Sequence, residues 1–373
     1  MRLLQRFLIY AMLVLGAVVF LLPLLWMIST GLKPIEQTMS MPPRWIPYKL
    51  FIEKDGQRIE VRRDELIEAP SYVVEIEGER HIVPQTGVAN GQMTQQLPNG
   101  GEKVTPVHVV QEIPASQQHP WAAVTPVAFT NATWEVVPAA ALIEKTAPRW
   151  GNFVAAIEAM KYFPMYLKNT LLLCLLTVFG TVSSSALAAY GFSRIEWRGR
   201  NALFTVALAT MMVPFPVTMV PMYCLYRWLG WIGTLKPLWV SSFFAGAFNV
   251  FLLRQFFMTL PKDISEAARI DGCGEFRIFW QIVLPLCRPA LMVVALFQFM
   301  YTWNDFIGPL IYLTNQEDFT LALGLQFFQS QQGGTQWHYL MAASTLVALP
   351  IIVLFFFTQK TFIEGISMTG IKG

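Results

Sequence analysis

The chain has 373 residues, of which 54% are hydrophobic and only 14% are charged, and its mean hydropathy is +0.44. These values exclude an ordinary soluble enzyme of this length and predict a polytopic protein embedded in a lipid bilayer. The net charge of +3 comes from scattered basic residues with no Lys/Arg run among aromatic residues, so we expect no nucleic-acid partner.

Six stretches are long and apolar enough to cross a bilayer, which takes about 20 helical residues. In chain order they are residues 7–28, 167–192, 202–225, 237–257, 290–313 and 339–358. The predicted fold class is therefore an all-α polytopic membrane protein with six transmembrane helices. Arg2 and Arg6 precede the first stretch, but its apolar run is too long for a signal peptide.

A long insert with a different composition separates the first two stretches. Residues 49–147 are rich in Pro, Val, Gln and charge, with alternating strings such as SYVVEIEGERHIV between turn residues. This pattern predicts short strands and loops, which form either a small β-rich domain or a partly extended segment. We predict boundaries at 1–48 for the first helix and the start of an outer loop, 49–147 for the insert, and 148–373 for a five-helix core.

The third stretch, ALFTVALATMMVPFPVTMVPMYCL, carries Pro214, Pro216 and Pro221. Each proline removes a backbone donor, so the helix is expected to be kinked or broken from its middle outward. Transporters place broken helices at binding sites, which makes Pro214 and Pro216 candidates for a substrate pathway. A helix that is only kinked for packing is the alternative.

The segment EAARIDGCGEFRIFWQIVLPLCRPA, residues 266–290, lies between the fourth and fifth stretches. Asp263 is a plausible N-cap because Glu266 follows it at the spacing of a capping box. Gly272 and Gly274 predict a turn. A second helix of about ten residues, too short to cross a bilayer, is expected to follow and to end at Pro285. Its apolar stripe comprises Phe276, Phe279, Trp280 and Val283.

Polar residues interrupt the fifth stretch. Gln298, Tyr301 and Asp305 fall on one helical face, with Thr302 beside Tyr301. An ionisable group inside a span is a functional candidate by default. The alternative is interhelical hydrogen bonding, with Trp303 as an interfacial anchor. The predicted substrate-pathway residues of this stretch are Gln298, Tyr301, Asn304 and Asp305.

The distribution of Lys and Arg over short loops predicts the orientation of the chain. The short outer loops carry only Arg227 and Lys236 if the N-terminus is cytoplasmic. We therefore expect both termini and residues 266–290 in the cytoplasm and the insert outside. The basic residues on the cytoplasmic side would be Arg2, Arg6, Arg194, Arg198, Arg200, Arg254, Lys262, Arg269, Arg277, Arg288, Lys360 and Lys372.

Motifs of known chemistry are missing from the chain. It has no G-x-x-x-x-G-K-[ST] phosphate loop and not even a Gly-Lys pair, so it cannot be its own P-loop ATPase. It also lacks H-E-x-x-H and G-x-S-x-G. We expect no catalytic residue, no metal site and no cofactor on this chain; ATP and Mg would belong to partner ATPase subunits.

EAARIDGCGEFRIFWQIVLP resembles the E-A-A-x-x-x-G loop of the membrane subunits of binding-protein-dependent ABC importers, whose pattern continues to I-x-L-P. The matching positions are Glu266, Ala267, Ala268, Asp271, Gly272, Ile282, Leu284 and Pro285. Cys273 stands where the family usually has alanine. Five further stretches resemble the maltose-transporter-type carbohydrate permeases: SMPPRWIP, YLKNTLLL, MMVPFPVTMVPMY, YTWNDFIGPLIYLT and GISMTGIKG. The resemblance covers nearly all of residues 1–48 and 148–373 and leaves the insert without a counterpart.

This resemblance implies a non-catalytic permease subunit of a sugar importer in a bacterial or archaeal cytoplasmic membrane. It implies as partners a second permease subunit, two ABC ATPase subunits and an extracytoplasmic solute-binding protein. In that family the loop, here residues 261–289, docks on the ATPase, and its movement on ATP-driven closure produces alternating access. The coupling residues implied here are Glu266, Ala267, Ala268, Asp271, Gly272, Phe276 and Trp280.

Two other functions stay open on the sequence alone. An ion-coupled secondary transporter would work without ATP, although the single set of six spans shows no obvious inverted repeat and no deep carboxylate. A membrane-anchored sensor or adhesion protein would act through the insert. For the insert we predict a role in guiding or holding the solute-binding protein.

Overall fold

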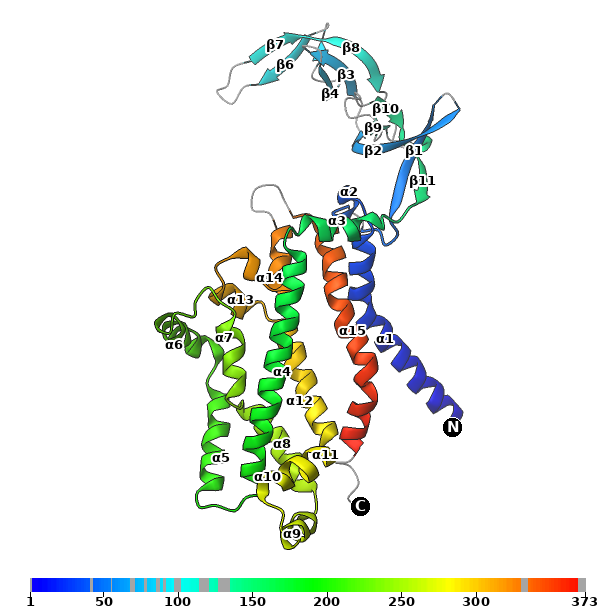
Figure 1. The fold of residues 1–373 in the computed structure, drawn as a ribbon. Coiled ribbons are helices and arrows are strands. Elements are labelled where there is room, and N and C mark those ends of the chain that lie inside the picture. Colours follow the sequence, from blue (N-terminus) through cyan, green and yellow to red (C-terminus); the bar gives the residue numbers. More distant parts are fainter. Residues whose placement is uncertain are drawn as a thin grey trace. The chain divides into compact units, whose positions relative to one another are not determined.

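The computed structural model describes residues 2–40, 43–54, 56–67, 71–76, 79–84, 88–89, 92–96, 102–113, 121–126, 135–329 and 335–367. The chain divides into two compact units, one of residues 1–35 and 150–373 and the other of residues 36–149. The first is helical and the second consists mainly of β-strands (Figure 1). Residues 36–48 lie with the strands, since the Gln37 side chain binds both the N–H and the carbonyl of Tyr48.

The helical unit is built around seven helices of ten or more residues: α1 (Arg2–Gly31), α4 (Phe163–Ser193), α5 (Arg200–Ala209), α6 (Phe215–Trp228), α8 (Ala247–Thr259), α12 (Arg288–Trp303) and α15 (Trp337–Ser367). Shorter helices connect them: α3 (Gly151–Ala159), η3 (Thr210–Met212), α7 (Lys236–Trp239), η4 (Val240–Phe243), α9 (Lys262–Ile270), α10 (Glu275–Ile278), η5 (Phe279–Val283), α11 (Leu284–Leu286), α13 (Ile307–Tyr312), η6 (Gln316–Asp318), α14 (Leu321–Gly324) and η7 (Leu325–Phe328). The four-residue helix α2 (Ile35–Thr38) begins at the boundary between the units.

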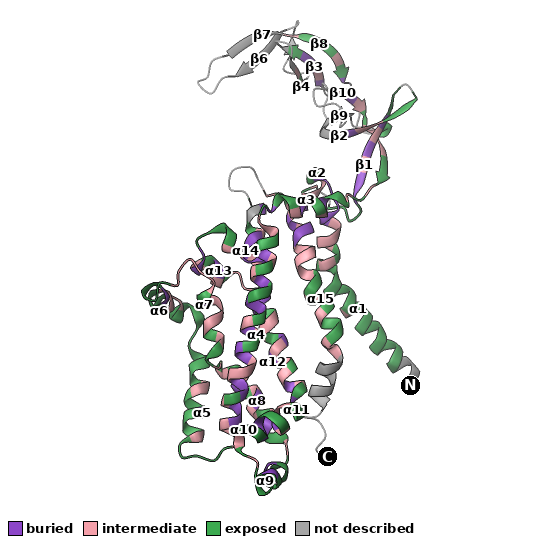
Figure 2. Ribbon diagram, in the orientation of Figure 1, coloured by how far each residue is buried: buried purple, intermediate pink, exposed green. Residues whose placement is uncertain are grey.

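Within the described residues, four helical stretches are long and apolar enough to cross a membrane: 5–31, 163–193, 236–259 and 337–359. The number rises to six if two bent pairs, 200–212 with 215–228 and 275–286 with 288–303, each count as one span. The predicted count of six therefore depends on these bent pairs. Many apolar side chains of the first bent pair are exposed, as expected for groups that face lipid (Figure 2).

The third predicted span is broken, which confirms the reading of its prolines. The segment before Pro214 and helix α6 after it are bent by 98°. Pro214 has the extended backbone φ −70° and ψ 143°, and α6 starts at the next residue. A helix cannot continue straight here because Pro214 and Pro216 both lack the N–H that helical hydrogen bonding requires.

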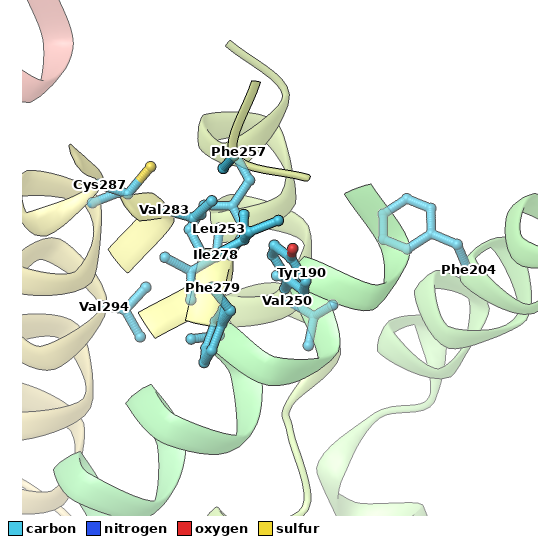
Figure 3. Packing of buried hydrophobic residues seen from close by; sticks show 14 residues of the cluster. Tyr190, Phe204, Val250, Leu253, Phe257, Ile278, Phe279, Val283, Cys287 and Val294 are labelled. Atoms are coloured by element: carbon cyan, nitrogen blue, oxygen red, sulfur yellow. The ribbon is translucent and has the colours of Figure 1, made fainter. Parts of the chain in front are cut away.

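Helix α4 forms the centre of the helical unit. It packs against α8 and α12, and a buried stripe runs along its length (Figure 2). Near its C-terminal end, Tyr190 joins an apolar cluster with side chains of α8, α10, η5 and α12, including Leu253, Ile278, Phe279 and Val294 (Figure 3). These elements are far apart in sequence, so the cluster fixes their relative positions in the core.

The described residues of the second unit form three antiparallel sheets, with strand orders β10-β9-β2-β1-β11, β4-β3-β8 and β5-β6-β7. The strands are β1 (Tyr48–Lys54), β2 (Gln57–Ile67), β3 (Ser71–Ile76), β4 (Glu79–Pro84), β5 (Val88–Ala89), β6 (Gln92–Gln96), β7 (Glu102–Pro106), β8 (His108–Ile113), β9 (Trp121–Pro126), β10 (Glu135–Pro138) and β11 (Ile143–Thr146). The alternating string singled out in the sequence forms the β3–β4 hairpin, with Val73 opposite Ile82.

Strand β9 connects two small cores of this unit. Ala122 and Val124 pack in one cluster with Leu50 of β1, whereas Ala123 packs in another with Val73 of β3. Because successive strand residues point to opposite faces, β9 is buried on both sides. The insert is therefore a folded β-rich unit rather than an extended segment.

The chain enters and leaves this unit through neighbouring strands. Tyr48 of β1 lies opposite Thr146 of β11, and Ala147 N–H donates to the Pro47 carbonyl at 3.1 Å. Arg44 Nη1 pairs with Glu144 Oε2 at 2.8 Å across the same two segments. The two ends of the insert are thus held side by side by contacts within the insert itself.

Candidate functional site

The helical unit contains a cavity of about 670 Å³. Its wall comes from α4, α6, α7, η4, α12, residues 304–306, α13 and Thr320. Aromatic lining residues are Phe215, Tyr226, Tyr301, Phe306 and Tyr312; those with polar groups include Ser241, Ser242, Gln298, Thr302, Asn304, Asp305 and Thr320. The cavity therefore offers apolar rings together with neutral hydrogen-bonding groups and one carboxylate, a composition typical of small-molecule sites.

Four of the predicted pathway residues meet in this cavity. Gln298, Tyr301, Asn304 and Asp305 all line it. Pro214 and Pro216 do not, although Phe215 between them does. The prolines act here through the break that they cause, since it brings Phe215 to the cavity wall.

The fifth predicted span does not continue to residue 313 as one helix. Helix α12 ends at Trp303, and Asn304 is its C-cap. Asp305 Oδ1 then accepts a hydrogen bond from the Gly308 N–H at 3.0 Å and so supports the start of α13. Asn304 and Asp305 therefore lie in a helix break and not inside a span. Short polar side chains of this kind are common at helix ends, because they form hydrogen bonds with backbone groups that have no helical partner.

A side chain at Gly308 would force its neighbours to shift. A Cβ atom on Gly308 would lie 2.5 Å from Asp305 Oδ2 and 3.0 Å from Leu238 Cδ2 of α7. Such contacts are closer than van der Waals packing allows. The glycine therefore permits the close approach of α13 and α7 on which this side of the cavity depends.

Hydrogen bonds connect the wall of the cavity to α4. Gln298 Nε2 donates to Thr302 Oγ1 at 3.1 Å, and Thr302 Oγ1 lies 2.8 Å from the buried Thr177 Oγ1 of α4. Trp303, the interfacial anchor in the alternative interpretation of this stretch, is only 2% exposed and donates from Nε1 to the Val347 carbonyl at 3.0 Å. It is a packing residue between α12 and α15 because its indole N–H finds a backbone acceptor there.

Most of the other lining residues were not indicated by the sequence, among them Phe215, Tyr226, Ser241, Ser242, Tyr312 and Thr320. Tyr226 and Tyr312 are edge to face, with ring centroids 5.2 Å apart, although they come from α6 and α13. No local spacing connects these residues. The proline-rich MMVPFPVTMVPMY stretch was the available signal for Phe215.

The E-A-A stretch forms a helix, a glycine turn and a second helical segment at one end of the helical unit (Figure 1). Helix α9 begins at Lys262 with Pro261 as its N-cap, so the prediction that Asp263 is the N-cap is wrong. Asp263 lies inside the first turn, where a carboxylate is favoured by the helix dipole. Gly272 has φ +80°, the left-handed backbone that the predicted turn requires.

The predicted coupling residues are mostly at the surface. Ala268 is buried in the cluster with Tyr190 and therefore holds α9 against the core. The exposed members are Glu266, Ala267, Asp271, Gly272, Phe276 and Trp280.

The apolar stripe of the second segment divides into two. Phe279 and Val283 are buried, whereas Phe276 and Trp280 are 72% and 63% exposed. Residues 279–283 form a π-helical turn, which widens the helix and changes the angular spacing of its side chains. Pro285 does not stop the helix, which continues to Leu286, because proline is tolerated in the first turn of α11.

The family model described as "Binding-protein-dependent transport system inner membrane component" matches residues 171–367 of this chain. The match includes the cavity residues of α4, α6 and α12 and the whole E-A-A stretch, and it excludes the insert.

Two curated relatives are similar to more than half of the chain. The chain is 37% identical over 212 residues to the arabinooligosaccharides transport system permease protein AraQ of Bacillus subtilis, covering 57% of this chain and 74% of the relative. It is also 37% identical over 226 residues to the maltodextrin transport system permease protein MalD of Streptococcus pneumoniae, covering 60% of this chain and 79% of the relative.

One solved structure, a bacterial ABC transporter involved in the import of the acidic polysaccharide alginate, has a similar fold. A chain of that transporter superposes with a TM-score of 0.53 at 22% identity, covering 58% of this chain and 80% of the other. The likeness concerns the fold alone.

Proposed function

Because this chain belongs to the family of binding-protein-dependent transport system inner membrane components, we propose that it forms half of the translocation pathway of an ATP-driven importer for a sugar or related solute. The chain is a multi-pass inner-membrane permease subunit. Its relatives named for arabinooligosaccharide and maltodextrin transport support a carbohydrate as the solute.

The observation that carries the proposal is the composition of the cavity. Sugars combine apolar C–H faces with many hydroxyl groups, so aromatic rings and neutral hydrogen-bonding groups suit both parts of their surface. Tyr226, Tyr301 and Tyr312 supply rings, and Gln298 and Asn304 supply amides. We assign Gln298, Tyr301, Asn304 and Asp305 to the pathway wall, with Pro214 and Pro216 shaping it through the helix break.

ATP hydrolysis is assigned to partner subunits, since the chain has no phosphate loop. The proposed assembly has a second permease subunit, two ABC ATPase subunits with their ATP and Mg, and an extracytoplasmic solute-binding protein. Phe276, Trp280 and Glu266 are all exposed and belong to the same coupling stretch, so they are available to bind an ATPase subunit. The broken helix of residues 200–228 is assigned to one span and α12 to another, which gives six spans together with the four long helical stretches.

We assign both termini and the coupling stretch to the cytoplasm. The Lys/Arg bias of the short loops supports this orientation. In the structure, the start of α1 and the end of α15 lie at the same end of the helical unit as α9 and α10, as this orientation requires (Figure 1).

Uptake by the reconstituted complex tests the function. The chain is placed in proteoliposomes with its second permease subunit, its ATPase and its binding protein. Uptake of radiolabelled maltodextrin or arabinooligosaccharide is expected to require ATP on the ATPase side and binding protein on the other side. Uptake that follows an ion gradient and ignores ATP would favour the secondary transporter instead.

The insert is proposed to guide or hold the solute-binding protein. Because Pro47 and Ala147 are adjacent through their backbone hydrogen bond, residues 48–146 can be replaced by a short glycine-containing turn. The deletion is expected to weaken the affinity of the complex for its binding protein while ATPase co-purification persists. An unchanged affinity would remove this role, and loss of all function except membrane anchoring would favour the sensor or adhesion reading.

A further inference from the structure

The last turn of α4 makes polar contacts with both ends of the α9–α10 segment. Arg194 is the C-cap of α4, and Tyr190 lies four residues before it in the chain. Tyr190 makes a hydrogen bond to α10, and Arg194 makes one to the junction of α8 and α9. No motif in the sequence pointed to this arrangement, because the contacts join segments more than sixty residues apart.

Tyr190 contacts the start of α10 through a carboxylate that also binds α9. The Tyr190 hydroxyl donates to Glu275 Oε2 at 2.6 Å, and Arg269 Nε in the last turn of α9 donates to Glu275 Oε1 at 2.7 Å. The Tyr190 ring is 5% exposed, with its centroid 5.1 Å from that of Phe279 (Figure 3). The hydrogen bonds from Arg269 and Tyr190 lower the pKa of the Glu275 carboxyl below its usual value, so the Arg269–Glu275 pair is charged at neutral pH.

Arg194 holds the other end of the segment. Its Nη2 donates to the Phe257 carbonyl at 2.5 Å and to the Leu260 carbonyl at 2.7 Å, where α8 ends and α9 is about to begin. In the reverse direction, Arg254 Nε of α8 donates to the Phe192 carbonyl of α4 at 3.1 Å. These carbonyls lie at or near the ends of helices, where some backbone carbonyls lack a helical N–H partner, and the Phe257 carbonyl also accepts the Leu260 N–H at 3.4 Å.

The expected strengths of these contacts show which of them connect α4 most firmly to the α9–α10 segment. The Arg269–Glu275 pair is 41% and 42% exposed, and ion pairs at such exposure contribute about 0–1 kcal/mol. Hydrogen bonds to a charged group are roughly twice as strong as neutral ones. Those of Tyr190 and Arg194 are also anchored on α4 in the core, so they are the firmer connections.

We propose that Tyr190 and Arg194 are positioning residues that make the end of α4 and the coupling stretch move as one rigid body. This inference rests on the proposed function. A displacement of α9 by the ATPase is then transmitted along α4, whose Leu173 lines the cavity and whose Thr177 contacts Thr302 of the cavity wall. Helix α4 is thereby the mechanical connection between the ATPase-docking stretch and the solute pathway.

The number of sugar molecules imported per ATP hydrolysed tests the proposal in the reconstituted complex. Tyr190→Phe removes one hydroxyl group, and Arg194→Gln removes the guanidinium. Each variant is expected to lower this ratio about fivefold, while the ATPase still co-purifies and still hydrolyses ATP. The matched controls are Tyr10→Phe on α1 and Arg198→Gln in the exposed loop after α4, both expected to keep the wild-type ratio.

A distance measurement makes the test independent of transport. Spin labels at Leu187 of α4 and Ile270 of α9, both exposed, are expected to keep one narrow distance distribution with and without ATP in the wild-type complex. The distribution is expected to broaden in Tyr190→Phe and Arg194→Gln.

The outcomes separate this proposal from the proposed function. If the wild-type complex imports no sugar with ATP, the proposed function fails. If the wild type imports sugar but both variants keep its ratio, or if the wild-type distance changes on ATP binding, the rigid connection is overturned and the importer function stands.

Discussion

The two ends of the helical unit are held together by different chemistry. Around the cavity, the contacts are neutral or involve a single carboxylate: Gln298 to Thr302, Thr302 to Thr177, and Gly308 to Asp305. At the coupling end, Arg194 and Arg254 bind helix-end carbonyls, and Tyr190 binds the carboxylate of Glu275. The coupling end therefore has the larger share of charge-assisted hydrogen bonds, which are the stronger class.

This difference corresponds to what each end has to do in a transporter. The pathway has to change shape so that it opens to one side and then to the other. The coupling end has to transmit a displacement without absorbing it. Weak neutral contacts and a glycine-dependent approach suit the first task, whereas charged groups bound to backbone carbonyls suit the second.

The largest effect is expected from a break in the coupling turn. Gly272→Pro places a residue with φ fixed near −65° where the backbone has φ +80°, which costs about 3 kcal/mol or more locally. Co-purification of the ATPase should be lost at equal membrane abundance. Gly274→Ala is the matched control, because Gly274 has a negative φ and no atom within 4 Å of an added Cβ. Equal ATPase recovery from both variants would contradict the coupling role of the turn.

A substitution at Gly308 should damage the cavity end more than the coupling end. Gly308→Ala brings a Cβ to 2.5 Å from Asp305 Oδ2 and is expected to cost about 1–3 kcal/mol in stability. Thermal unfolding in detergent measures this loss, and sugar uptake should fall with it while the ATPase still co-purifies. In Gly246→Ala the nearest atom is 3.6 Å away, so its unfolding temperature should stay close to that of the wild type. Equal unfolding temperatures of the two variants would show that α13 and its neighbours can shift to accommodate the added Cβ.

Removal of a ring from the pathway should have an intermediate effect. Tyr301 is 67% exposed and lines the cavity, so Tyr301→Ala removes a contact surface without leaving a core void. Uptake at saturating binding protein is expected to fall about tenfold, the equivalent of about 1.4 kcal/mol. ATPase co-purification should not change. Uptake at the wild-type rate would remove Tyr301 from the pathway.

A smaller effect is expected from the hydroxyl pair between α4 and α12. Thr177→Val and Thr302→Val each remove one partner of a buried hydrogen bond of 2.8 Å, which is worth about 1 kcal/mol. A double-mutant cycle on thermal unfolding should give a coupling energy of that size. Additive effects of the two substitutions would show that the hydroxyl groups do not interact.

The smallest effect should come from the exposed charge pair of the coupling stretch. Arg269→Gln is expected to change stability by less than about 1 kcal/mol, because the pair is 41% and 42% exposed. Its effect on the sugar-to-ATP ratio should be smaller than that of Arg194→Gln in the same assay. A larger effect of Arg269→Gln than of Arg194→Gln would indicate that the contact between α9 and α10, and not α4, is the mechanical connection.

The role of Gln298, Tyr301, Asn304 and Asp305 in a solute pathway stays a prediction. Sequence reasoning grouped these four residues because they follow one another on a single stretch, and all of them line one cavity. It failed for residues such as Tyr226 and Tyr312, whose proximity is decided by the bend at Pro214 and by tertiary packing.

Errors of detail arose where local signals competed. The chain is extended at Pro261 and so starts α9 before Asp263, and the π-helical turn separates Phe276 and Trp280 from the buried Phe279. In the insert, alternation predicted strands such as β3 and β4. Their order within the sheets follows from long-range pairing, as in β2 with β9, which no local pattern specifies. The tail motif GISMTGIKG extends beyond residue 367, so residues 368–373 lie outside the described part of the chain.

The paired strands at the root of the insert have an evolutionary consequence. The entropy of closing a loop is lost by whichever contacts bring its ends together. Here β1 and β11 close it, through the pairing of Tyr48 with Thr146 and the Arg44–Glu144 contact. The membrane helices therefore supply little of the free energy that closing this loop of about 100 residues requires. A lineage of such permeases could gain, enlarge or lose this module in one genetic step without redesigning its membrane helices.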